Sequence, residues 1–544
     1  MKLKMLKINS ETPGTWSFFW PVLFSWVLFL VLMRYVWPYQ GIAMGEESVG
    51  IAAYVLIHQI PNMMPLIPLV MVPHAIHLFG CDIPAMMLIY HGPWGIYFLT
   101  PFIALGGCTL ATLRCYAAFM FFFALWGTWR LALLLHGDRT TAFLSTLLLA
   151  VCPTVVTTRS MLVTAPDVAA SVWTLCFAIM FARERKPGYA CAACAAFFAG
   201  ACTRAWVAGL GVGLLIYGAL TWRQVLALLP RERPQRWRLI AGCLACAGVF
   251  LLPIIAYNAG HGWPTVKFYA SHLIKRASTG NNLNYWTNLQ ISFSQLARLC
   301  DGSKLGVLSR EPWHWLYVLP LLLSLAHAAM EVQRRRTLWT VPAMLWIAAI
   351  GYLLASAVSP TQQFTMHLVP LAPILCVLMF SWIGAVSKDA KRAAILAMAV
   401  LCATQFFGDF YLLRRKNIDF EAIGWAGNSP IVIEVCRWAE EKPRMPIISL
   451  SLSFSLAAPY FSQNRIRLIA RWPWAGRASD RIPWRKYFFR EDRPYFLVEN
   501  SSIPLFNYLP TLEAAASEFG VRLTKIMTFR DSTGRPEFEM YQVQ

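Results

Sequence analysis

The stretch Met44-Gly45-Glu46-Glu47-Ser48-Val49-Gly50 places two adjacent carboxylates just after the first long apolar run of the chain, which extends from residue 16 to residue 37. Ionised groups at membrane depth are costly, so acids retained there indicate a functional site. The helix dipole also favours carboxylates in a first turn, which gives the pair a structural use as well. Adjacent helical residues point about 100° apart, so we expect either Glu46 or Glu47, but not both, to face a site.

The composition is that of a polytopic α-helical membrane protein. Hydrophobic residues make up 57% of the chain, charged residues only 14%, and the mean hydropathy is +0.49, whereas soluble domains carry about 25% charged residues. The net charge of +21 lies largely in short loops between apolar runs, where Lys and Arg set membrane orientation. This charge therefore does not indicate a nucleic-acid partner.

Apolar length and basic loops together predict about 11 membrane spans. Lys2, Lys4 and Lys7 precede the first run and no cleavage site follows it, which predicts an uncleaved signal-anchor with a cytoplasmic N-terminus. Prolines divide the first outer segment, 38–108, into pieces too short to span, which suit interfacial or re-entrant helices. The remaining spans are expected near residues 109–131, 140–157, 167–183, 189–203, 205–222, 239–258, 313–331, 338–358, 362–386 and 391–413.

The C-terminal region is more charged than the rest of the chain and has no apolar run long enough to span a membrane, which predicts a second domain. With a cytoplasmic N-terminus, an odd number of spans places this region on the outer side of the membrane, which we expect to be a plasma membrane such as a bacterial inner membrane. Helices are expected at 430–441 and 511–519, buried strands at 446–452 and 494–498, and a hairpin from 521–529 to 537–543. The predicted domains are therefore a transmembrane catalytic domain, 1–415, and an extracytoplasmic α/β domain, 416–544.

Two further charged residues at the outer membrane edge are candidates for chemistry. Asp167, in Thr164-Ala165-Pro166-Asp167, either caps a helix or serves a site, and Arg159 lies one short loop before it. Arg204 is the one basic residue between two apolar spans on the predicted outer side, which suggests an anionic partner. Arg binds phosphate through bidentate hydrogen bonds, and pairing with a carboxylate is the alternative.

Three other motifs have structural interpretations. Cys191-Ala192-Ala193-Cys194 has redox spacing but lacks the strand of a thioredoxin motif, so its cysteines are expected to pack as small hydrophobes. The glycines of 209–213 are expected at a helix–helix contact. His74 and His77 would share a helix face, but two histidines without a third ligand are weak support for a metal site.

The order of motifs resembles that of the GT-C glycosyltransferases, in the protein mannosyltransferase and lipid A aminoarabinose transferase branch. The resemblance covers roughly residues 16–415, while the C-terminal domain matches in placement only. It rests on the acidic pair in the first outer loop, followed in order by Tyr90-His-Gly-Pro-Trp-Gly-Ile-Tyr97, Gly106-Gly107, Leu113-Arg114, Asp167, Gly200-Ala-Cys-Thr-Arg204 and Met366-His-Leu-Val-Pro-Leu-Ala-Pro373.

This resemblance implies a polyprenyl-phosphate sugar donor and chemistry at the outer face. The family's first-loop motif is usually Asp-Glu, whose first acid is the base; here both are Glu, so the base is either Glu46 or Glu47. Arg204 stands where the family has Lys, and the Arg expected near His367 is missing. The implied site has Glu46, Glu47 and Asp167 as catalytic residues, Arg204, Lys267, Lys275 and His367 around the donor phosphate, and His91, Trp94 and Arg159 lining the substrate pocket.

The sequence therefore predicts a membrane glycosyltransferase that moves a hexosyl or pentosyl group to an acceptor hydroxyl. The acceptor is a lipid, a protein or a polysaccharide, and no nucleic acid is expected to bind. No cofactor is certain, and a divalent metal near Asp167 is left open. The alternative is a transporter or flippase of a lipid-linked sugar, which the absence of an inverted repeat disfavours; a scaffold that presents the outer domain would not need the retained acids.

Overall fold

The structure is a computed structural model of the 544-residue chain. It describes residues 19–37, 46–59, 74–78, 80–86, 92–152, 161–267, 270, 285–301, 314–358, 368–414, 431–442, 445–463, 465–470, 482–500, 508–530, 534 and 536–544. The chain forms two compact units. The helical unit contains residues 1–36, 90–95 and 117–418, and the sheet unit contains residues 37–89, 96–116 and 419–544. Parts of the first loop thus group with the C-terminal region, and the domain boundary expected at 415/416 stays a prediction.

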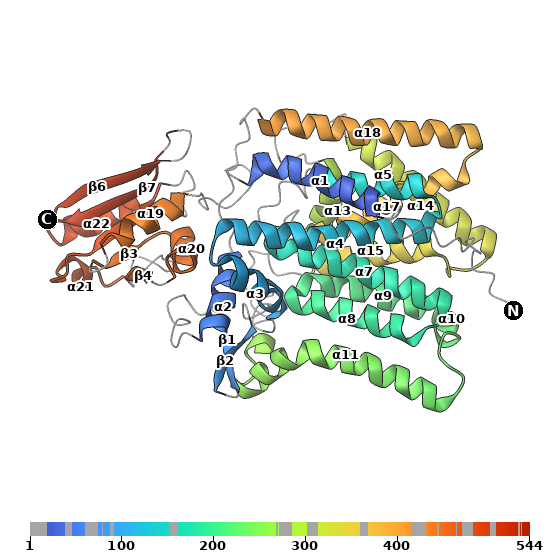
Figure 1. Ribbon diagram of the computed structural model, residues 1–544, viewed down its shortest axis with the longest axis horizontal. Coiled ribbons are helices and arrows are strands. Elements are labelled where there is room, and N and C mark those ends of the chain that lie inside the picture. Colours follow the sequence, from blue (N-terminus) through green and yellow to red (C-terminus); the bar gives the residue numbers. More distant parts are fainter. Residues whose placement is uncertain are drawn as a thin grey trace. The chain divides into compact units, whose positions relative to one another are not determined.

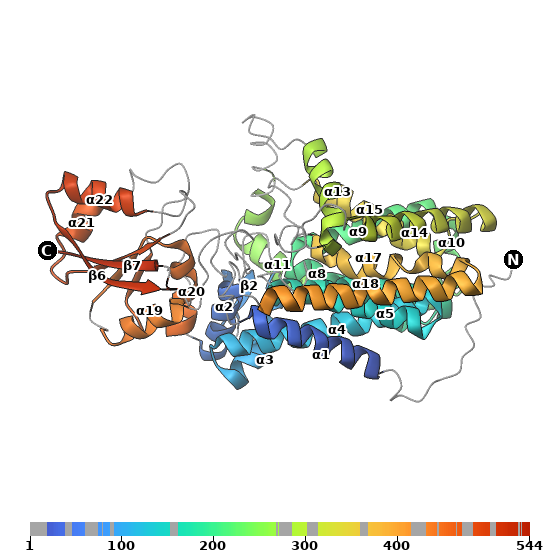
Figure 2. The same ribbon diagram turned by 90° about the horizontal axis from the view of Figure 1, so that it is seen from above.

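The helical unit is built from long helices that lie side by side (Figures 1 and 2). Their bounds are α1 Phe19–Val36, α4 Leu110–His136 (which the two units share), α5 Arg139–Ala150, α7 Met161–Glu184, α8 Pro187–Thr203, η3 Ala205–Val207, α9 Ala208–Leu220, α10 Trp222–Leu226, α11 Arg233–Gly260, α13 Tyr285–Asp301, α14 His314–Arg335, α15 Val341–Ser356, η6 Val369–Leu371, α17 Ala372–Leu378, η7 Ser381–Ala385 and α18 Lys388–Arg414.

Several of these helices have the length and composition of membrane spans. Among the described residues, four helices are long and apolar enough to cross a bilayer, at Leu110–His136, Thr164–Glu184, Arg233–Gly260 and Lys388–Tyr411, and shorter apolar helices accompany them. Leu244 and Leu252 on α11 are 66% and 65% exposed, as expected for side chains that face lipid. The helical membrane class is confirmed, while the number of 11 spans stays a prediction.

Glycines allow α9 and α15 to pack at close range. A Cβ on Gly351 would lie 2.2 Å from the Cα of Gly213, and a Cβ on Gly209 would lie 3.3 Å from the ring of Tyr352. Small residues let helix backbones approach in membranes, where van der Waals contact drives association. The helix-contact interpretation of the 209–213 glycines is therefore confirmed.

The sheet unit contains a five-stranded mixed sheet in the order β4-β3-β5-β7-β6. Strands β3 (Ile447–Ser449), β4 (Leu468–Ala470) and β5 (Tyr495–Glu499) are parallel, and β7 (Pro536–Val543) is antiparallel to both β5 and β6 (Leu523–Arg530). The hairpin expected between 521–529 and 537–543 is therefore confirmed as β6 and β7. The remaining elements of this unit are α2 Glu46–His58, β1 His74–Leu78, β2 Cys81–Met86, α3 Trp94–Gly106, α19 Ile431–Glu440, α20 Leu452–Ser462, α21 Trp484–Phe488 and α22 Leu509–Glu518.

Helices cover both faces of this sheet (Figure 2). Helices α19 and α20 pack with Ile447 and Leu497 on one face, whereas α21 and α22 pack with Ile448 and Phe496 on the other. Side chains alternate across a strand, so each central strand contributes to both cores. The continuous apolar run at 495–498 follows from this double burial, and the run at 446–450 is interrupted only by the buried Ser449.

One part of the first loop differs from expectation. Residues 74–86 form an antiparallel hairpin of β1 and β2 rather than an interfacial helix. Gly80, at the turn, has a φ of +79°, a conformation that glycine adopts without steric cost. His74 and His77 therefore lie on a strand and not on a helix face, and the Nδ1 of His77 is 3.0 Å from Oδ1 of Asp82.

The close contact of α9 with α15 generates a stability prediction. Gly213→Ala would put a Cβ 2.5 Å from the carbonyl oxygen of Ala348, while a Cβ on Gly218 of the same helix meets nothing within 4 Å. Overpacking costs about 1–3 kcal/mol, whereas Gly→Ala in an open helix position gains about 1 kcal/mol. Thermal unfolding in detergent should therefore show a lower Tm for Gly213→Ala and an equal or higher Tm for Gly218→Ala; the reverse order contradicts this packing.

Candidate functional site

Asp167 is a buried acid inside helix α7. The helix begins at Met161, so Asp167 lies in its second turn and does not cap it. The side chain is 1% exposed, and neither carboxylate oxygen accepts a hydrogen bond from any residue that the structure describes. Burial of an ion costs several kcal/mol even after relaxation of the surroundings. The helix-cap interpretation is therefore wrong, and Asp167 needs another reason to be retained.

Arg204 supplies the opposite charge. It lies between α8 and η3, where its extended backbone ends α8 and its N–H donates to the carbonyl of Gly200 at 2.8 Å. The side chain is 8% exposed and lies within electrostatic range of Asp167. Helices α7 and α8 pack together, and a Cβ on Gly200 would lie 2.6 Å from the Cβ of Ala170, so small residues allow this approach. The structure therefore brings together two residues that the sequence singled out separately.

Tyr352 on α15 is the third member of this group. It is 1% exposed and lies within electrostatic range of both Asp167 and Arg204. Its ring packs on Gly209, one turn after Arg204 in the chain. We call Asp167, Arg204 and Tyr352 the charged cluster. Sequence reasoning missed Tyr352, although a Gly-Tyr pair inside an otherwise apolar span is a signal that would have found it.

The motif at 90–97 meets the end of α8 that carries Arg204. A Cβ on Gly92 would lie 2.1 Å from the carbonyl oxygen of Cys202 and 2.7 Å from Cδ1 of Ile254, so only glycine fits there. The indole N–H of Trp94 donates to the carbonyl oxygen of Phe250 on α11 at 2.9 Å. Two motifs that are a hundred residues apart in the sequence are thus neighbours in the fold.

The other predicted site residues have different outcomes. Lys267 is exposed on a short helical turn after α11, where Asn258 holds the chain by accepting from the N–H of Thr265 at 3.0 Å. Glu46 and Glu47 begin α2. The segment η6, which belongs to the motif at 366–373, packs against α7. His91, Arg159, Lys275 and His367 lie outside the described residues.

Within the sheet unit, helix α2 is held by α20. A Cβ on Gly50 would lie 2.7 Å from the ring of Tyr460 on α20. The Tyr460 hydroxyl donates to the carbonyl oxygen of Thr109, between α3 and α4, at 3.0 Å. Tyr460 is fully buried, and Val49 is 2% exposed. The helix that Glu46 and Glu47 begin therefore rests on the C-terminal part of the chain.

A second buried acid, Asp409, lies on α18 and was also missed. Its Oδ1 accepts from Nε2 of Gln405 at 2.9 Å, and the hydroxyl of Tyr317 on α14 donates to Oε1 of Gln405. Asp409 is 5% exposed. An acid within the apolar run 393–413 is the signal that identifies it.

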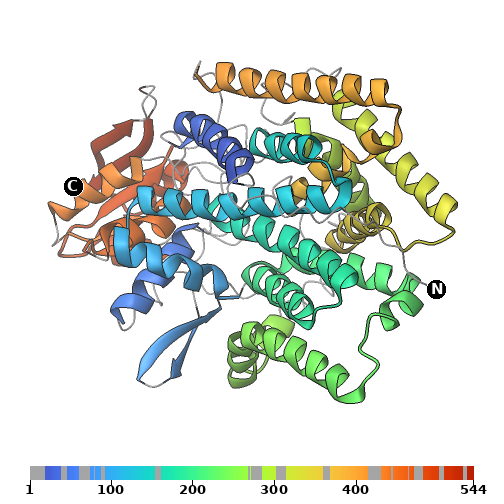
Figure 3. The same ribbon diagram turned by 45° about the vertical axis from the view of Figure 1, so that its right-hand side comes forward.

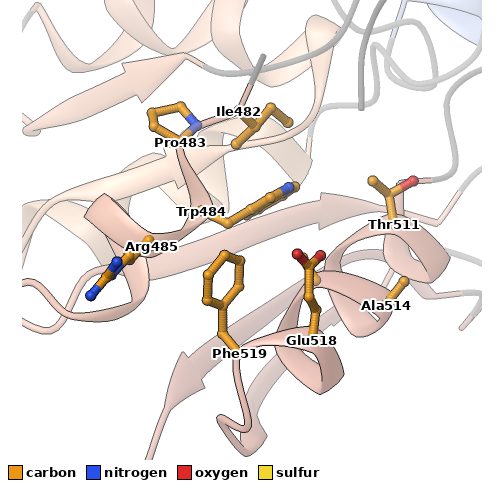
Figure 4. A pocket seen from close by; sticks show the side chains of 9 residues that line it. Ile482, Pro483, Trp484, Arg485, Thr511, Ala514, Glu518 and Phe519 are labelled. Carbon is orange, nitrogen blue, oxygen red and sulfur yellow. The ribbon is translucent and has the colours of Figure 1, made fainter. Parts of the chain in front are cut away.

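The sheet unit carries a pocket of about 500 Å³ between α21 and α22 (Figure 4). Trp484 lies across it, Phe519 forms one side, and the Glu518 carboxylate points in beside them (Figure 4). Aromatic faces with a carboxylate suit contact with sugars, although Trp484 also belongs to the core beneath. Elsewhere in the described part of the chain, no group of three or more His, Cys, Asp or Glu residues is arranged to hold a metal ion.

Comparison with known proteins identifies the fold. No family model matches the chain, and no curated protein matches its sequence. Among solved structures, ArnT from Cupriavidus metallidurans bound to undecaprenyl phosphate matches with a TM-score of 0.61 and 13% identity, over 96% of this chain and 98% of that one. The apo state of the same protein matches with a TM-score of 0.60 and 12% identity, over 96% and 97% of the two chains. The resemblance to the GT-C glycosyltransferases is therefore confirmed as a likeness of fold.

The contact of α2 with α20 generates a prediction about stability. Gly50→Ala should lower the Tm because the new methyl group meets the Tyr460 ring, although alanine is intrinsically about 1 kcal/mol better in a helix. In a Tyr460→Leu background the same change should cost nothing or stabilise. The measurement is a double-mutant cycle of thermal unfolding in detergent, and simple additivity of the two changes would show that the contact does not form.

Proposed function

We propose that this protein is an integral membrane glycosyltransferase that transfers a sugar from a polyprenyl-phosphate-linked donor to an acceptor hydroxyl. The charged cluster, in a chain with the ArnT fold, is the observation that carries the proposal. A buried arginine with a bidentate guanidinium suits a lipid phosphate in low dielectric. The protein of like fold is described as bound to undecaprenyl phosphate, which supports the same donor class here.

In the proposed reaction, the acceptor hydroxyl attacks the anomeric carbon of the donor. Glu46 or Glu47 takes the hydroxyl proton, and a new carbon–oxygen bond forms while the bond to the phosphate oxygen breaks. The polyprenyl phosphate leaves with the bonding electron pair. Arg204 stabilises this developing negative charge, as preorganised donors do in a water-excluded site. A phosphate leaving group needs little help from a general acid.

Asp167 has a positioning role in this mechanism. It lies within electrostatic range of Arg204, and in the proposed mechanism its carboxylate holds the guanidinium near the end of α8 before the donor binds. Its two carboxylate oxygens make no hydrogen bond to a described residue, so they also suit an acceptor hydroxyl. A divalent metal at Asp167 remains an alternative partner for the donor phosphate.

The remaining residues complete the proposed site. Lys267, Lys275 and His367 surround the donor phosphate in this proposal, and His91, Trp94 and Arg159 line the substrate pocket. Trp94 would act mainly through its position, because its indole N–H already donates to Phe250.

The proposed setting is a plasma membrane, such as a bacterial inner membrane, crossed by 11 spans. The N-terminus is cytoplasmic, and the C-terminal domain with the reacting groups lies on the outer side. The acceptor is a lipid, a protein or a polysaccharide. The pocket of Trp484 and Glu518 offers an aromatic face and a carboxylate for an acceptor that contains sugar.

Removal of the base should abolish transfer without loss of the protein. Glu46→Gln or Glu47→Gln, whichever is the base, should reduce transfer of labelled sugar from a synthetic polyprenyl phosphate in membranes by about 10²–10⁴-fold. Asp82→Asn, an acid in the exposed β1–β2 hairpin, is the control and should keep full activity. Full activity in both glutamine variants would sink this assignment, and sugar moved across the bilayer without transfer would favour a flippase.

The catalytic rate should depend on the bidentate guanidinium of Arg204 as well as on its positive charge. Arg204→Ala should lower kcat by about 10²–10³-fold, as loss of one preorganised donor does, and Arg204→Lys should recover part of the rate because it restores the charge without the bidentate fork. Lys186→Ala, in the exposed pair with Glu184 just before α8, is the control. Equal rates for Arg204→Ala and Lys186→Ala would exclude a role at the phosphate.

A further inference from the structure

Two identical cysteine spacings occur on neighbouring helices. Cys191 and Cys194 lie on α8, and Cys243 and Cys246 lie on α11, each pair three residues apart. Residues at this spacing share one face of a helix. Helix α8 packs between α7 and α11 (Figures 1 and 3). From sequence alone, the pair on α8 is expected to pack as small hydrophobes. The structure places the pair on α11 next to it, which makes a joint role of the four cysteines possible.

The two pairs face each other. Helices α8 and α11 pack together, and Cys191 interacts electrostatically with Cys243 and Cys246, as Cys194 does with Cys243. Gly242 makes this possible, because a Cβ there would lie 2.9 Å from the sulfur of Cys191. All four are free thiols. A disulfide requires Cα atoms about 4.4–6.8 Å apart. Because Gly242 has no side chain, the backbones of α8 and α11 can approach each other closely at this point.

These thiols are also accessible, unlike the buried cysteines of the described residues. All four are partly exposed, whereas Cys176, Cys202, Cys376 and Cys402 are buried. Only 6% of the residues in the apolar stretch of α11 are buried, so a membrane around this helix would bring lipid close to the cysteines. An oxidant that reaches the cluster would therefore be one that dissolves in the hydrocarbon.

The arrangement favours sulfur–sulfur pairing over metal binding. Soft thiolates bind zinc or copper(I) when four converge as a tetrahedron. In the part of the chain that the structure describes, no three or more potential ligands converge in that way. The interactions of Cys191 with Cys243 and Cys246 instead run across the helix interface, where two thiols can join without a metal.

We propose that these four cysteines are a redox site, at which a lipid-soluble quinone oxidises one thiol of α8 and one thiol of α11 to an interhelical disulfide. The two S–H bonds break and one S–S bond forms. The two protons and two electrons pass to the quinone, which becomes a hydroquinone. Thiol–disulfide exchange with a small dithiol reverses the step.

The disulfide would tie together two helices that serve the charged cluster. Helix α8 ends at Thr203, next to Arg204, and α11 provides the carbonyl oxygen of Phe250 that holds Trp94. The cross-link would therefore fix the first half of α8 against α11, while the last residue of α8 adjoins Arg204. The existence of the redox site does not depend on the proposed glycosyltransferase activity.

The test counts thiols in the full-length protein. Membranes are treated with a short-chain quinone or with diamide, quenched, denatured and labelled with maleimide–polyethylene glycol. The chain has 14 cysteines, and oxidation should remove at least two of the labelled thiols, with recovery after dithiothreitol. Mass analysis of the digest should find a peptide of α8 joined to a peptide of α11.

Two double variants make the test specific. Cys243→Ser/Cys246→Ser should abolish the loss of thiols, while Cys376→Ser/Cys402→Ser, which removes two buried cysteines, should leave it unchanged. An unchanged thiol count in the parent protein overturns the proposal. Stoichiometric zinc or copper in the purified protein that disappears in Cys243→Ser/Cys246→Ser would also overturn it, in favour of a metal site.

Discussion

The proposed site depends on the proximity of Asp167 and Arg204, two buried side chains within electrostatic range of each other. Each is buried among apolar helices, where an isolated ion costs several kcal/mol and neutralises or finds a partner. Their helices α7 and α8 approach closely because Gly200 lacks a side chain. Gly92 then brings the motif at 90–97 against the carbonyl of Cys202. Small residues thus allow the helices of the charged cluster to approach each other. In the proposed function, the charged side chains then bind the donor phosphate.

The sheet unit supports a different part of the proposed site. Helix α2 lies against α20 through Gly50 and Tyr460, and Tyr460 also reaches Thr109. The C-terminal region therefore does more than follow the membrane part in the sequence, because it holds the helix that begins with Glu46 and Glu47.

The sequence predicts periodic and compositional features well and long-range contacts poorly. Buried strands such as 495–499 and the hairpin of β6 and β7 follow from apolar runs and turn residues. The hairpin of β1 and β2 was missed because prolines and histidines obscure its alternation. Tyr352, Asp409 and the partnership of Cys191 with Cys243 depend on helix packing between distant segments, which one sequence does not encode locally.

The most direct test is the affinity of the purified protein for a polyprenyl phosphate without its sugar. Native mass spectrometry should be used to compare the parent chain with Arg204→Ala and with Lys186→Ala, which removes an exposed charge. If the charged cluster binds the donor phosphate, Arg204→Ala should weaken binding by at least tenfold, about 1.4 kcal/mol, and Lys186→Ala should bind as the parent does. Equal affinity in all three proteins would contradict the account.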